Sequence, residues 1–504
     1  MNIERLCELK GNREIMRMGK LFYTTRSSYL YDTGTGKVVK LDSNSKKVME
    51  ALFNENMNVD QFKSVLMSVQ NIEEICAFLK KENLLCNPSI TRFVDISSRY
   101  LDDGYHCNQL IIELTGKCTL RCKYCVYNEF YEGNRNFNTN NIDFETAKKA
   151  IDYVYAHNDH KKLAITFYGG EPLVNFRVMK QCIDYSLANL EVENLLFAFT
   201  TNLTLMTKEI ANYLAQIPNM SIVLSVDGPE EIHNRSRVNQ KGQGSFQDVF
   251  TGLKNIAEAV NKYKKTKLSF NAVFMPPYTA EKFERINSFF EGLDFMPEGT
   301  EVRATYPAPN TIPDSYYEEM ESYGELGLEE EEWISWAKSK VEGGSFSTGK
   351  LNLYTEVLTS GLTSIHNRLL YTKPMNWTFY NGCCVPSERR LYVCTDGSYK
   401  ICERVGTAPS IGHVDTGIDI QAINKYYLGD YERKSIPDCA NCWAVNLCDI
   451  CYAHCYDENG LNMDVKKQLC PEIRDRYLMW LQYYHELLET QPQKIEEISL
   501  IEIS

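Results

Sequence analysis

The sequence lacks long apolar runs and an excess of positive charge. No uninterrupted hydrophobic stretch approaches the ~20 residues that a membrane helix requires, and residues 1–7 do not form the apolar core of a signal peptide. We therefore expect a cytoplasmic protein without membrane contact. Lys and Arg total 54 against 67 Asp and Glu, a formal net charge of −13. A general nucleic-acid binder presents a basic face, so we expect no nucleic-acid partner.

Cysteine, in contrast, is abundant, with 18 residues. Disulfide frameworks belong to far shorter secreted chains, which indicates thiols in a reducing compartment. Cys118, Cys122 and Cys125 have C-x3-C-x2-C spacing and follow the apolar run 110–114. Zinc sites favour two separated C-x2-C pairs, and neighbours in one short loop rarely form disulfides. Three such thiolates hold three irons of a [4Fe–4S] cube and leave the fourth iron open.

This triplet, with Tyr124 before its last cysteine, resembles the signature of the radical S-adenosylmethionine (SAM) enzymes. The resemblance implies that Cys118, Cys122 and Cys125 are metal ligands and catalytic residues. Their cluster would chelate SAM at its open iron and cleave it to a 5′-deoxyadenosyl radical. The implied fold class is α/β, a partial (β/α)6 TIM-like barrel.

Further motifs follow in the order that this family requires. Gly169-Gly170-Glu171-Pro172 resembles its GGEP motif, whose backbone meets the SAM amino group; glycine permits such close approach, although Gly-Gly alone is often a turn. Asn202 ends a stretch similar to the ribose-side motif. Ser225 and Arg237 match residues that contact the SAM carboxylate and ribose, and a guanidinium fork suits a carboxylate. A helix cap and a surface charge are the alternatives for these two. The implied cofactor-binding residues are Tyr124, Gly169, Gly170, Glu171, Asn202, Ser225, Asp227 and Arg237.

Ten cysteines lie between Cys383 and Cys470 and resemble the SPASM extension, which carries two auxiliary [4Fe–4S] clusters. By resemblance, Cys384 and Cys402 with Cys451 or Cys455 hold the inner cluster. The outer cluster would use Cys439, Cys442, Cys448 and Cys470. The roles of Cys383 and Cys394 stay open, and two structural zinc ions are the alternative. The spacing Cys442-x5-Cys448-x2-Cys451 is closer to that of thioether-forming peptide maturases, and an inner cluster with three protein thiolates would leave an iron for a substrate cysteine.

The N-terminal part predicts a small separate module. β-Branched and aromatic residues predict strands at 22–25, 29–32 and 37–41, with a glycine-containing turn at 33–36. Residues 42–45 are suited to cap a helix, and further helices are expected at 59–68 and 72–85. The pattern resembles the winged-helix recognition element of ribosomal peptide biosynthesis, in which a leader peptide adds a strand to the sheet. A DNA-binding winged helix is the competing interpretation.

The central part alternates apolar runs with helical segments. This alternation predicts βα units around a parallel sheet, whose chemistry lies at the carboxyl ends of the strands. The runs are 109–115, 162–168, 195–201, 220–226, 267–275 and 301–306. The acidic stretch 318–332 is expected to be a solvated face, with docking of a basic peptide as the alternative. Trp333, Trp336, Tyr354 and Leu358 suggest a helical bridge. The expected domains are 1–100 (winged helix), 105–320 (barrel), 321–375 (bridge), 376–475 (SPASM) and 476–504 (helix and tail).

Together these features predict a radical SAM peptide maturase of the sactipeptide or ranthipeptide type. It would bind the leader of a ribosomally made precursor and form thioether crosslinks in the core, with electrons from a donor such as flavodoxin or ferredoxin. The alternatives are a sulfatase-maturating enzyme that makes formylglycine, a C–C crosslinking or epimerising peptide enzyme, and a zinc-stapled regulator. The precursor, the bond formed and the oligomeric state stay open.

Overall fold

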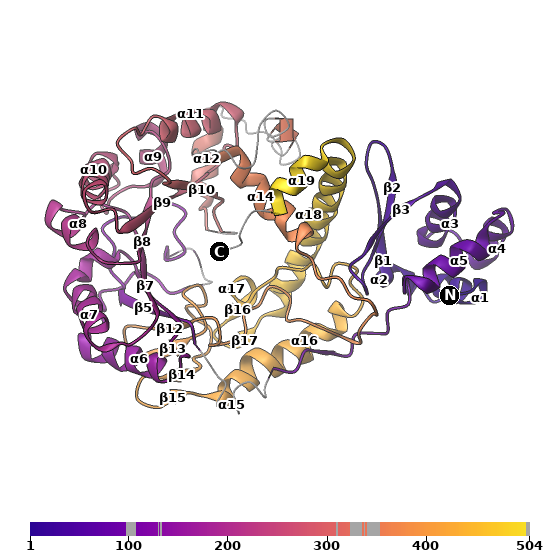
Figure 1. Ribbon diagram of the computed structural model, residues 1–504, viewed down its shortest axis with the longest axis horizontal. Coiled ribbons are helices and arrows are strands. Elements are labelled where there is room, and N and C mark those ends of the chain that lie inside the picture. Colours follow the sequence, from indigo (N-terminus) through magenta and orange to yellow (C-terminus); the bar gives the residue numbers. More distant parts are fainter. Residues whose placement is uncertain are drawn as a thin grey trace.

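A ten-stranded sheet occupies the centre of the computed structural model, which describes residues 1–96, 107–129, 131, 134–308, 311–322, 335–336, 338–339 and 353–499. Its strands follow the order β10-β9-β8-β7-β6-β5-β12-β13-β14-β15, and in Figure 1 they follow an arc with helices on its outer side. The first six of these strands pair in parallel. They are β5 (Gln109–Thr115), β6 (Lys162–Gly169), β7 (Asn194–Thr201), β8 (Met220–Ser225), β9 (Thr266–Val273) and β10 (Glu301–Thr305). The six predicted apolar runs are thus confirmed as strands of a mostly parallel α/β sheet.

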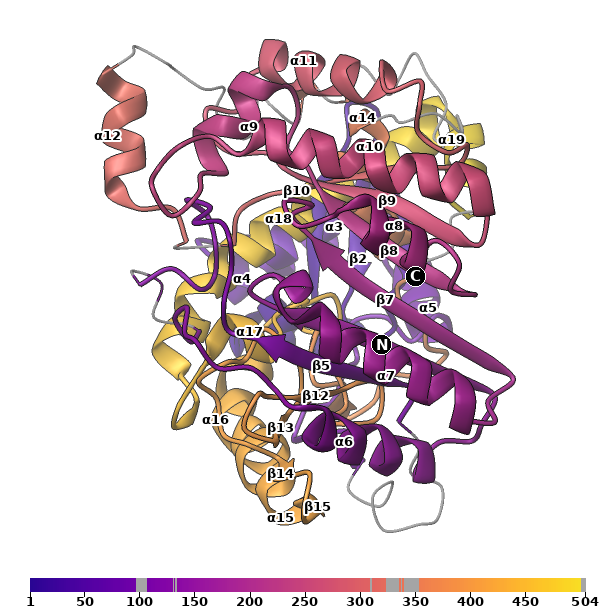
Figure 2. The ribbon, with the colours of Figure 1, turned by 90° about the vertical axis from the view of Figure 1, so that its left-hand side faces the viewer.

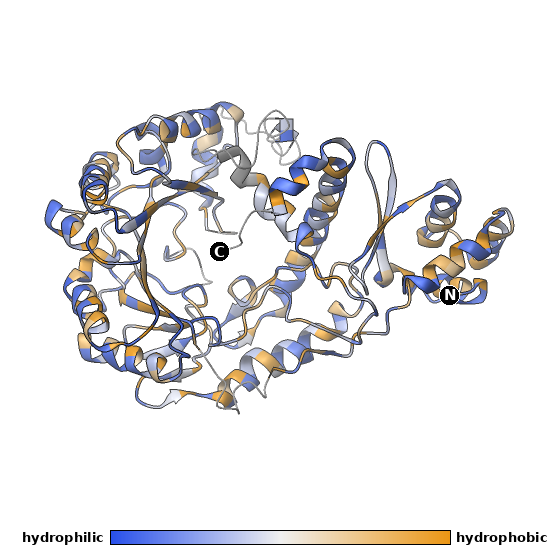
Figure 3. Ribbon diagram, viewed as in Figure 1, coloured by the Kyte–Doolittle hydropathy of each residue, from blue (hydrophilic) through white to orange (hydrophobic). Residues whose placement is uncertain are grey.

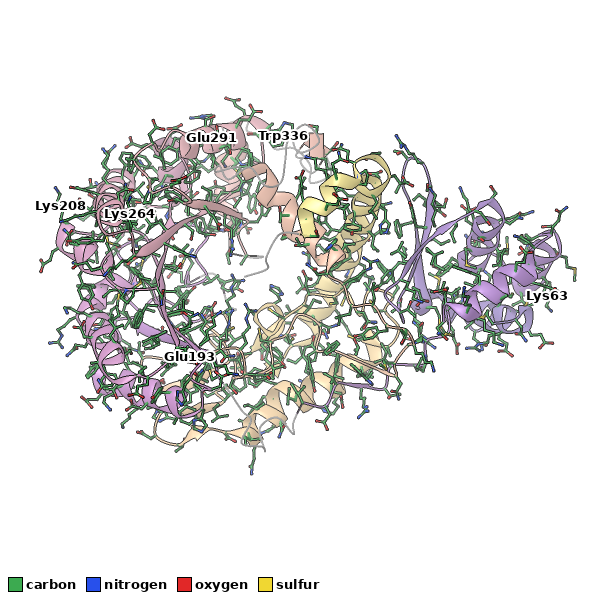
Figure 4. The ribbon with its side chains drawn as sticks, viewed as in Figure 1. Lys63, Glu193, Lys208, Lys264, Glu291 and Trp336 are labelled. Carbon is green, nitrogen blue, oxygen red and sulfur yellow. The ribbon has the colours of Figure 1, made fainter. Side chains whose placement is uncertain are left out.

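Amphipathic helices connect these strands. They are α6 (Phe144–Ala156), the 3₁₀ turn η2 (Pro172–Asn175), α7 (Phe176–Asn189), α8 (Lys208–Leu214), α9 (Glu230–Ser236), α10 (Phe246–Tyr263) and α11 (Ala280–Glu291). Figure 2 shows α6, α7 and α10 in front of the strands, and Figure 3 shows polar and apolar residues on each helix. In α10, Val249, Leu253 and Ile256 are buried at helical spacing. Charged residues such as Lys208 and Lys264 lie on the outer rim (Figure 4).

The cysteine-rich region continues the same sheet, which its sequence did not indicate. β12 (Leu391–Val393) pairs in parallel with β5, and three short strands follow it in antiparallel order. These are β13 (Ser398–Lys400), β14 (Gly412–His413) and β15 (Gly417–Ile418). A three-residue strand is too short to show the alternation by which longer strands are recognised. The region is therefore anchored directly beside the strand that leads to Cys118.

Helices and coil make up the rest of that region. They include α15 (Ile420–Ala422), the π-helical segment η3 (Ile423–Gly429), α16 (Asp430–Cys439), α17 (Tyr452–Cys455), the strands β16 (Tyr456–Asp457) and β17 (Gly460–Leu461), α18 (Met463–Thr490) and α19 (Pro492–Ser499). The predicted C-terminal helix begins at Met463 rather than after residue 476, because the Asn462 side chain caps it, and it continues past Pro471. Cys470 therefore sits on a helix and not in a loop.

The N-terminal module has three strands and the three expected helices, but its first strand lies at 19–23 and not at 22–25, because Thr24 begins the turn in which its amide donates to the Ser27 carbonyl. A three-stranded antiparallel sheet contains β1 (Gly19–Tyr23), β2 (Ser28–Asp32) and β3 (Val38–Leu41), with β2 in the middle. The helices are α1 (Ile3–Gly11), α2 (Ile15–Met18), α3 (Ser43–Phe53), α4 (Val59–Met67) and α5 (Ile72–Lys81). The Asp42 side chain accepts a hydrogen bond from the Ser45 amide at 2.7 Å and caps α3 as expected. α1 and α2 were not predicted, and α5 ends before Asn83 and Leu85, whose positive φ angles break the helix.

The predicted bridge is described only in part. The acidic stretch from residue 323 on and Trp333 lie outside the described residues, whereas α12 (Asp314–Ser322) and α14 (Leu353–His366) are described. Trp336 contacts Phe283 with ring centroids 5.7 Å apart, and Leu358 is buried. β4 (Arg92–Phe93) pairs with β11 (Trp377–Thr378), so the end of the N-terminal module is joined to the start of the cysteine-rich region. Among the described helices, none has the length and apolarity that crossing a membrane would require.

Candidate metal and SAM site

The predicted cluster loop follows the carboxyl end of β5. Burial raises the pKa of the Cys118 and Cys125 thiols to about 12, and the Cys122 thiolate adds to both shifts. Burial also raises the pKa of Cys122, whereas the nearby Arg237 guanidinium lowers it. The three half-buried cysteines therefore influence one another electrostatically. They stay protonated until a metal displaces their protons.

Gly169 and Gly170 pack against the backbone of this loop. A Cβ at Gly169, whose φ is +136°, would lie 2.3 Å from the carbonyl oxygen of Thr115. One at Gly170 would lie 2.2 Å from the carbonyl oxygen of Lys117. The Gly170 amide donates to Thr115 and the Glu171 amide to Lys117, both at 2.9 Å. Sequence reasoning attributed these glycines to the approach of a ligand, but the close approach in the structure is to the cysteine loop itself.

The Glu171 carboxylate is saturated by groups of the protein. It is buried and accepts hydrogen bonds from the Asn202 amide at 2.7 Å, the Thr201 hydroxyl at 2.9 Å and the Leu173 amide at 3.1 Å. Asn202 in turn donates from Nδ2 to Thr119 Oγ1 at 3.0 Å and to Cys118 Sγ at 3.6 Å. Glu171 thus holds the end of β7 against the cysteine loop. Thr201 and Thr119 were missed, since a lone threonine gives no sequence signal.

Tyr124, Asp227 and Arg237 form a second buried network beside the loop. The Tyr124 hydroxyl donates to Asp227 Oδ2 at 2.7 Å and accepts from Arg237 Nη1 at 2.5 Å. Arg237 Nη1 also lies 3.6 Å from Asp227 Oδ1. Arg237 is 6% exposed, so the alternative of a solvated surface charge is wrong. Burial alone would lower the pKa of Arg237, but the nearby Cys122, Tyr124 and Asp227 raise it well above its ordinary value.

Ser225 ends β8 and is buried beside this network. The helix that follows, α9, has Pro229 at its N-cap and no side-chain cap. The alternative of a capping role for Ser225 is therefore wrong. All eight predicted cofactor-binding residues come from the cysteine loop or from the carboxyl ends of β6, β7 and β8 and the segments that follow.

Four cysteines of the C-terminal region line one cavity of about 300 Å³. They are Cys439 at the end of α16, Cys442 and Cys448 in the following coil, and Cys470 on α18. Lys466 also lines the cavity and donates to Cys439 Sγ at 3.7 Å. These are the four thiols that the sequence grouped as the outer ligand set.

A second group contains Cys384, Cys402 and Cys451. The Cys451 thiolate adds to the raised pKa of Cys402, mainly a result of burial, and Cys384 acts likewise on Cys451. Cys455 is 2% exposed and donates to the carbonyl oxygen of Cys451 at 3.5 Å. The choice between Cys451 and Cys455 as ligand stays a prediction.

Cys383 and Cys394 differ in their surroundings. Burial raises the pKa of Cys383, and the Cys455 and Cys451 thiolates add to the shift. For Cys394, burial and the carboxylate of Glu113 raise the pKa to about 12, and the other charged neighbours are Lys400 and Asp396. Cys383 therefore lies at the edge of the inner group, and Cys394 lies apart from it.

No three His, Cys, Asp or Glu side chains in the described part of the chain stand close enough together to hold a single metal ion. A zinc ion binds four ligands at bonds of about 2.0–2.3 Å. An iron–sulfur cube carries its irons at separate corners, so its thiolates stand farther apart.

Comparison with known proteins agrees with this geometry. Residues 112–290 match the model of the radical SAM superfamily. An uncharacterized protein of Methanocaldococcus jannaschii is 35% identical over 29% of this chain and 46% of its own length. The radical SAM cyclopropyl synthase TigE of Paramaledivibacter caminithermalis is 27% identical over 34% and 36%. The cysteine-type anaerobic sulfatase-maturating enzyme of Clostridium perfringens is 30% identical over 37% and 49%.

The chain thus spans about half or less of the length of these relatives. The solved structure of native anSMEcpe with bound AdoMet superposes with a TM-score of 0.51 at 19% identity, over 78% of this chain and 100% of that one. This likeness concerns the fold. The chain therefore carries a radical SAM domain, and it is related in sequence to a sulfatase-maturating and a cyclopropane-forming enzyme. Proteins of this superfamily bind SAM and [4Fe–4S] clusters.

Proposed function

We propose that the chain is a radical SAM enzyme that modifies a ribosomally made peptide and closes thioether bonds between cysteine sulfur and carbon. The observation that carries the proposal is the occurrence of further half-buried thiols in the region that β12 joins to β5, with four of them lining one cavity and three more grouped separately. SAM cleavage alone requires only the loop. The additional thiols suit an enzyme that also handles a substrate thiol and removes electrons.

The residues of the loop suit a SAM-binding cluster. Cys118, Cys122 and Cys125 would supply its three thiolates, and when bound it supplies the electron that cleaves SAM to a 5′-deoxyadenosyl radical. Arg237 places a buried positive charge beside Cys122, which compensates thiolate charge. Its Nε has no hydrogen-bond partner among the described residues, so one donor is left for the cofactor. Asn202 and Tyr124 hold the two ends of the loop in place.

The inner thiol set explains why a thioether is proposed. Cys384, Cys402 and Cys451 would give a cluster three protein thiolates and leave one position for a substrate cysteine. A thiolate bound there is deprotonated and held at a fixed place. Two electrons and two protons would leave the peptide when the C–S bond forms. One of each leaves as the hydrogen atom taken by the 5′-deoxyadenosyl radical, the second electron would pass to an auxiliary cluster, and the thiol proton would be released to solvent when the cysteine binds.

The free edge of β3 is the proposed binding place for the leader of the precursor. In the described residues β3 pairs only with β2. The Asp32 amide donates to the Lys37 carbonyl, so Asp32 and Lys37 are a hydrogen-bonded pair of β2 and β3. Along antiparallel strands, hydrogen-bonded pairs alternate with pairs whose backbone groups point away from each other. Val39 therefore faces β2, whereas the backbone groups of Val38 and Lys40 point to the free edge. An added peptide strand would pair with these two residues.

A pair of variants at Lys40 tests this proposal. Proline at an outward-facing edge position keeps the β2–β3 pairing but removes the donor that an added strand needs. We expect Lys40→Pro to weaken binding of a labelled precursor up to about tenfold, since one lost backbone hydrogen bond is worth up to about 1.5 kcal/mol. Lys40→Ala removes the same side chain and keeps the amide, so it should bind like the unmodified protein.

The product identifies the chemistry. With cysteine-containing precursors encoded beside the gene, SAM and reductant, we expect a product lighter by two hydrogens whose cysteines resist alkylation. The same mass loss with alkylatable cysteines would indicate a C–C crosslink, and an unchanged mass an epimerase. Release of 5′-deoxyadenosine with unmodified precursor would contradict the thioether assignment.

Maturation of a sulfatase is the second candidate, because the chain is 30% identical to a cysteine-type sulfatase-maturating enzyme over 193 residues. Such an enzyme would convert a cysteine of a short sulfatase peptide and would not use the β3 edge. Equal activity of Lys40→Pro and Lys40→Ala on that peptide, with aldehyde formation, would favour this candidate.

A further inference from the structure

Lys466 buries its ammonium group beside the four-cysteine cavity. The residue lies on α18 and is 2% exposed. Its Nζ donates to Ser435 Oγ at 2.7 Å and to Cys439 Sγ at 3.7 Å, and lies 4.2 Å from the centre of the Tyr431 ring. The next residue, Lys467, behaves differently: its side chain is 58% exposed and pairs with Asp438 at 3.2 Å.

Lys466 has no carboxylate partner within 4 Å in the part of the chain that the structure describes. A buried charge without a counter-charge is strongly unfavourable, so buried lysines are nearly always paired. A hydroxyl and an aromatic face compensate an ammonium only in part. The remaining compensation has to come from the cavity, where the groups that contact Nζ are the Ser435 hydroxyl and the Cys439 thiol.

An iron–sulfur cube with four thiolates supplies that charge. Its net charge is negative in both oxidation states, and it becomes more negative by one unit on reduction. The potential of such a cluster depends on nearby charge and on hydrogen bonds to its sulfurs. A fixed ammonium that donates to Cys439 Sγ stabilises the reduced form more than the oxidised form.

We propose that Lys466 is a positioning residue of the outer auxiliary cluster and sets its reduction potential. The cluster is held by Cys439, Cys442, Cys448 and Cys470, and Lys466 makes it easier to reduce. One electron enters the cluster from the inner site or the external donor, and no proton is required. This inference rests on the proposed function, because it assumes that the C-terminal thiols hold clusters.

The test is a redox titration followed by electron paramagnetic resonance. It uses the full chain with Cys118, Cys122 and Cys125 changed to Ala, so that only the two auxiliary clusters contribute. The signal of the outer cluster is assigned with a double variant that carries Cys442→Ala and Cys470→Ala. This variant should lose that signal and about four irons per chain. The variants compared are Lys466→Met, Lys466→Arg and the matched control Lys467→Met.

For Lys466→Met we expect the ratio of reduced to oxidised outer cluster, at fixed ambient potential, to fall on the order of tenfold, which is about 59 mV for one electron. Lys466→Arg keeps the charge and should stay close to the parent. Lys467→Met should do the same, because its charge is solvated and paired with Asp438. The inner couple should not move in any variant.

An unchanged outer potential in Lys466→Met at full iron content would overturn the inference. If Lys466→Met loses iron, the test is Lys466→Arg instead. An outer-cluster reduction potential close to that of the parent protein supports a role of the charge at position 466, and a lower potential refutes it. Loss of no iron in Cys442→Ala with Cys470→Ala would refute the ligand set. A parent chain without any iron–sulfur spectrum would instead refute the proposed function.

Discussion

The three-cysteine loop and the outer thiol set lie on different kinds of secondary structure. Cys118, Cys122 and Cys125 lie on one loop, whose first residues pair with the backbone at Gly170 and Glu171 at the end of the neighbouring strand. The outer thiols come from α16, a coil and α18, and no strand of the described residues runs through 439–455. The first site thus depends on the sheet, and the second depends on how helices pack.

The two sites also differ in whether a carboxylate lies beside their buried cation. Arg237 has a buried carboxylate beside it, Asp227, so the site at the loop is partly compensated by the protein. Lys466 has no such partner within reach among the described residues. The outer site therefore depends more on the charge of what it binds. This contrast predicts that loss of a ligand has different consequences in the two parts.

The largest effect is expected from Cys122→Ala. Without this thiolate the loop holds only two irons, and the position for SAM is lost. Release of 5′-deoxyadenosine from SAM and reductant should fall by at least about 10³-fold, a modest part of the acceleration that enzymes provide. Cys86→Ala makes the same chemical change at an exposed cysteine of the N-terminal module and should leave the rate unchanged. A Cys122→Ala variant that still cleaves SAM would refute the assignment of the loop.

Much of the site at the three-cysteine loop could be predicted from sequence, because its residues lie at strand ends and strand ends can be predicted. Each of the runs before Cys118, Gly169, Asn202 and Ser225 alternates or is continuously apolar, and parallel strands end at one edge of the sheet. Their convergence follows from topology alone. What the sequence could not show is that Glu171 turns inward to bind the Asn202 amide, since this depends on the register between β6 and β7.

The second site was harder to predict, for a physical reason. The resemblance to the SPASM extension implied the grouping of Cys439, Cys442, Cys448 and Cys470, which share a cavity. Spacing gave no hint of Lys466, because one lysine on a helix of mixed polarity looks like any solvated charge. The strand β12 was missed as well, since its pairing with β5 is decided by contacts distant in sequence.

A smaller effect separates Cys402 from Cys394. The pKa of Cys402 is raised by burial, by Glu403 and by the Cys451 thiolate, whereas no cysteine is among the charged neighbours of Cys394, which are Glu113, Lys400 and Asp396. Cys402→Ala should therefore lower the iron content of the reconstituted protein by up to about four per chain, one cube. Cys394→Ala should keep its iron and lose only the small stability of a buried thiol, about 1 kcal/mol. Iron analysis with visible spectra checks both, and an equal loss in the two variants would contradict the grouping.

The smallest effect concerns the contact between the N-terminal module and α18, whose far end carries Glu489. This carboxylate accepts hydrogen bonds from Thr24 Oγ1 at 2.7 Å and from the Tyr29 hydroxyl at 2.8 Å, and Lys40 Nζ lies 3.7 Å away. Burial alone would raise its pKa, but hydrogen bonds from Ser27, Thr24 and Tyr29 outweigh it and lower the pKa to about 2.

Because the folded pKa is below the ordinary value of 4.5, the ionised Glu489 stabilises the folded protein above pH ~4.5, and this contribution is lost as the pH falls toward 2. Glu489→Gln should cost about 1.5–3 kcal/mol at pH 7, the range for hydrogen bonds to a charged group. Amide hydrogen exchange of β1 and β2 should accelerate accordingly in the variant, and its difference from the parent should shrink below pH ~4.5. Glu486→Gln, one turn earlier on the same helix, is the matched control. If both variants exchange alike, the module is held by its apolar contacts, such as Phe22 against His485, and not by this carboxylate.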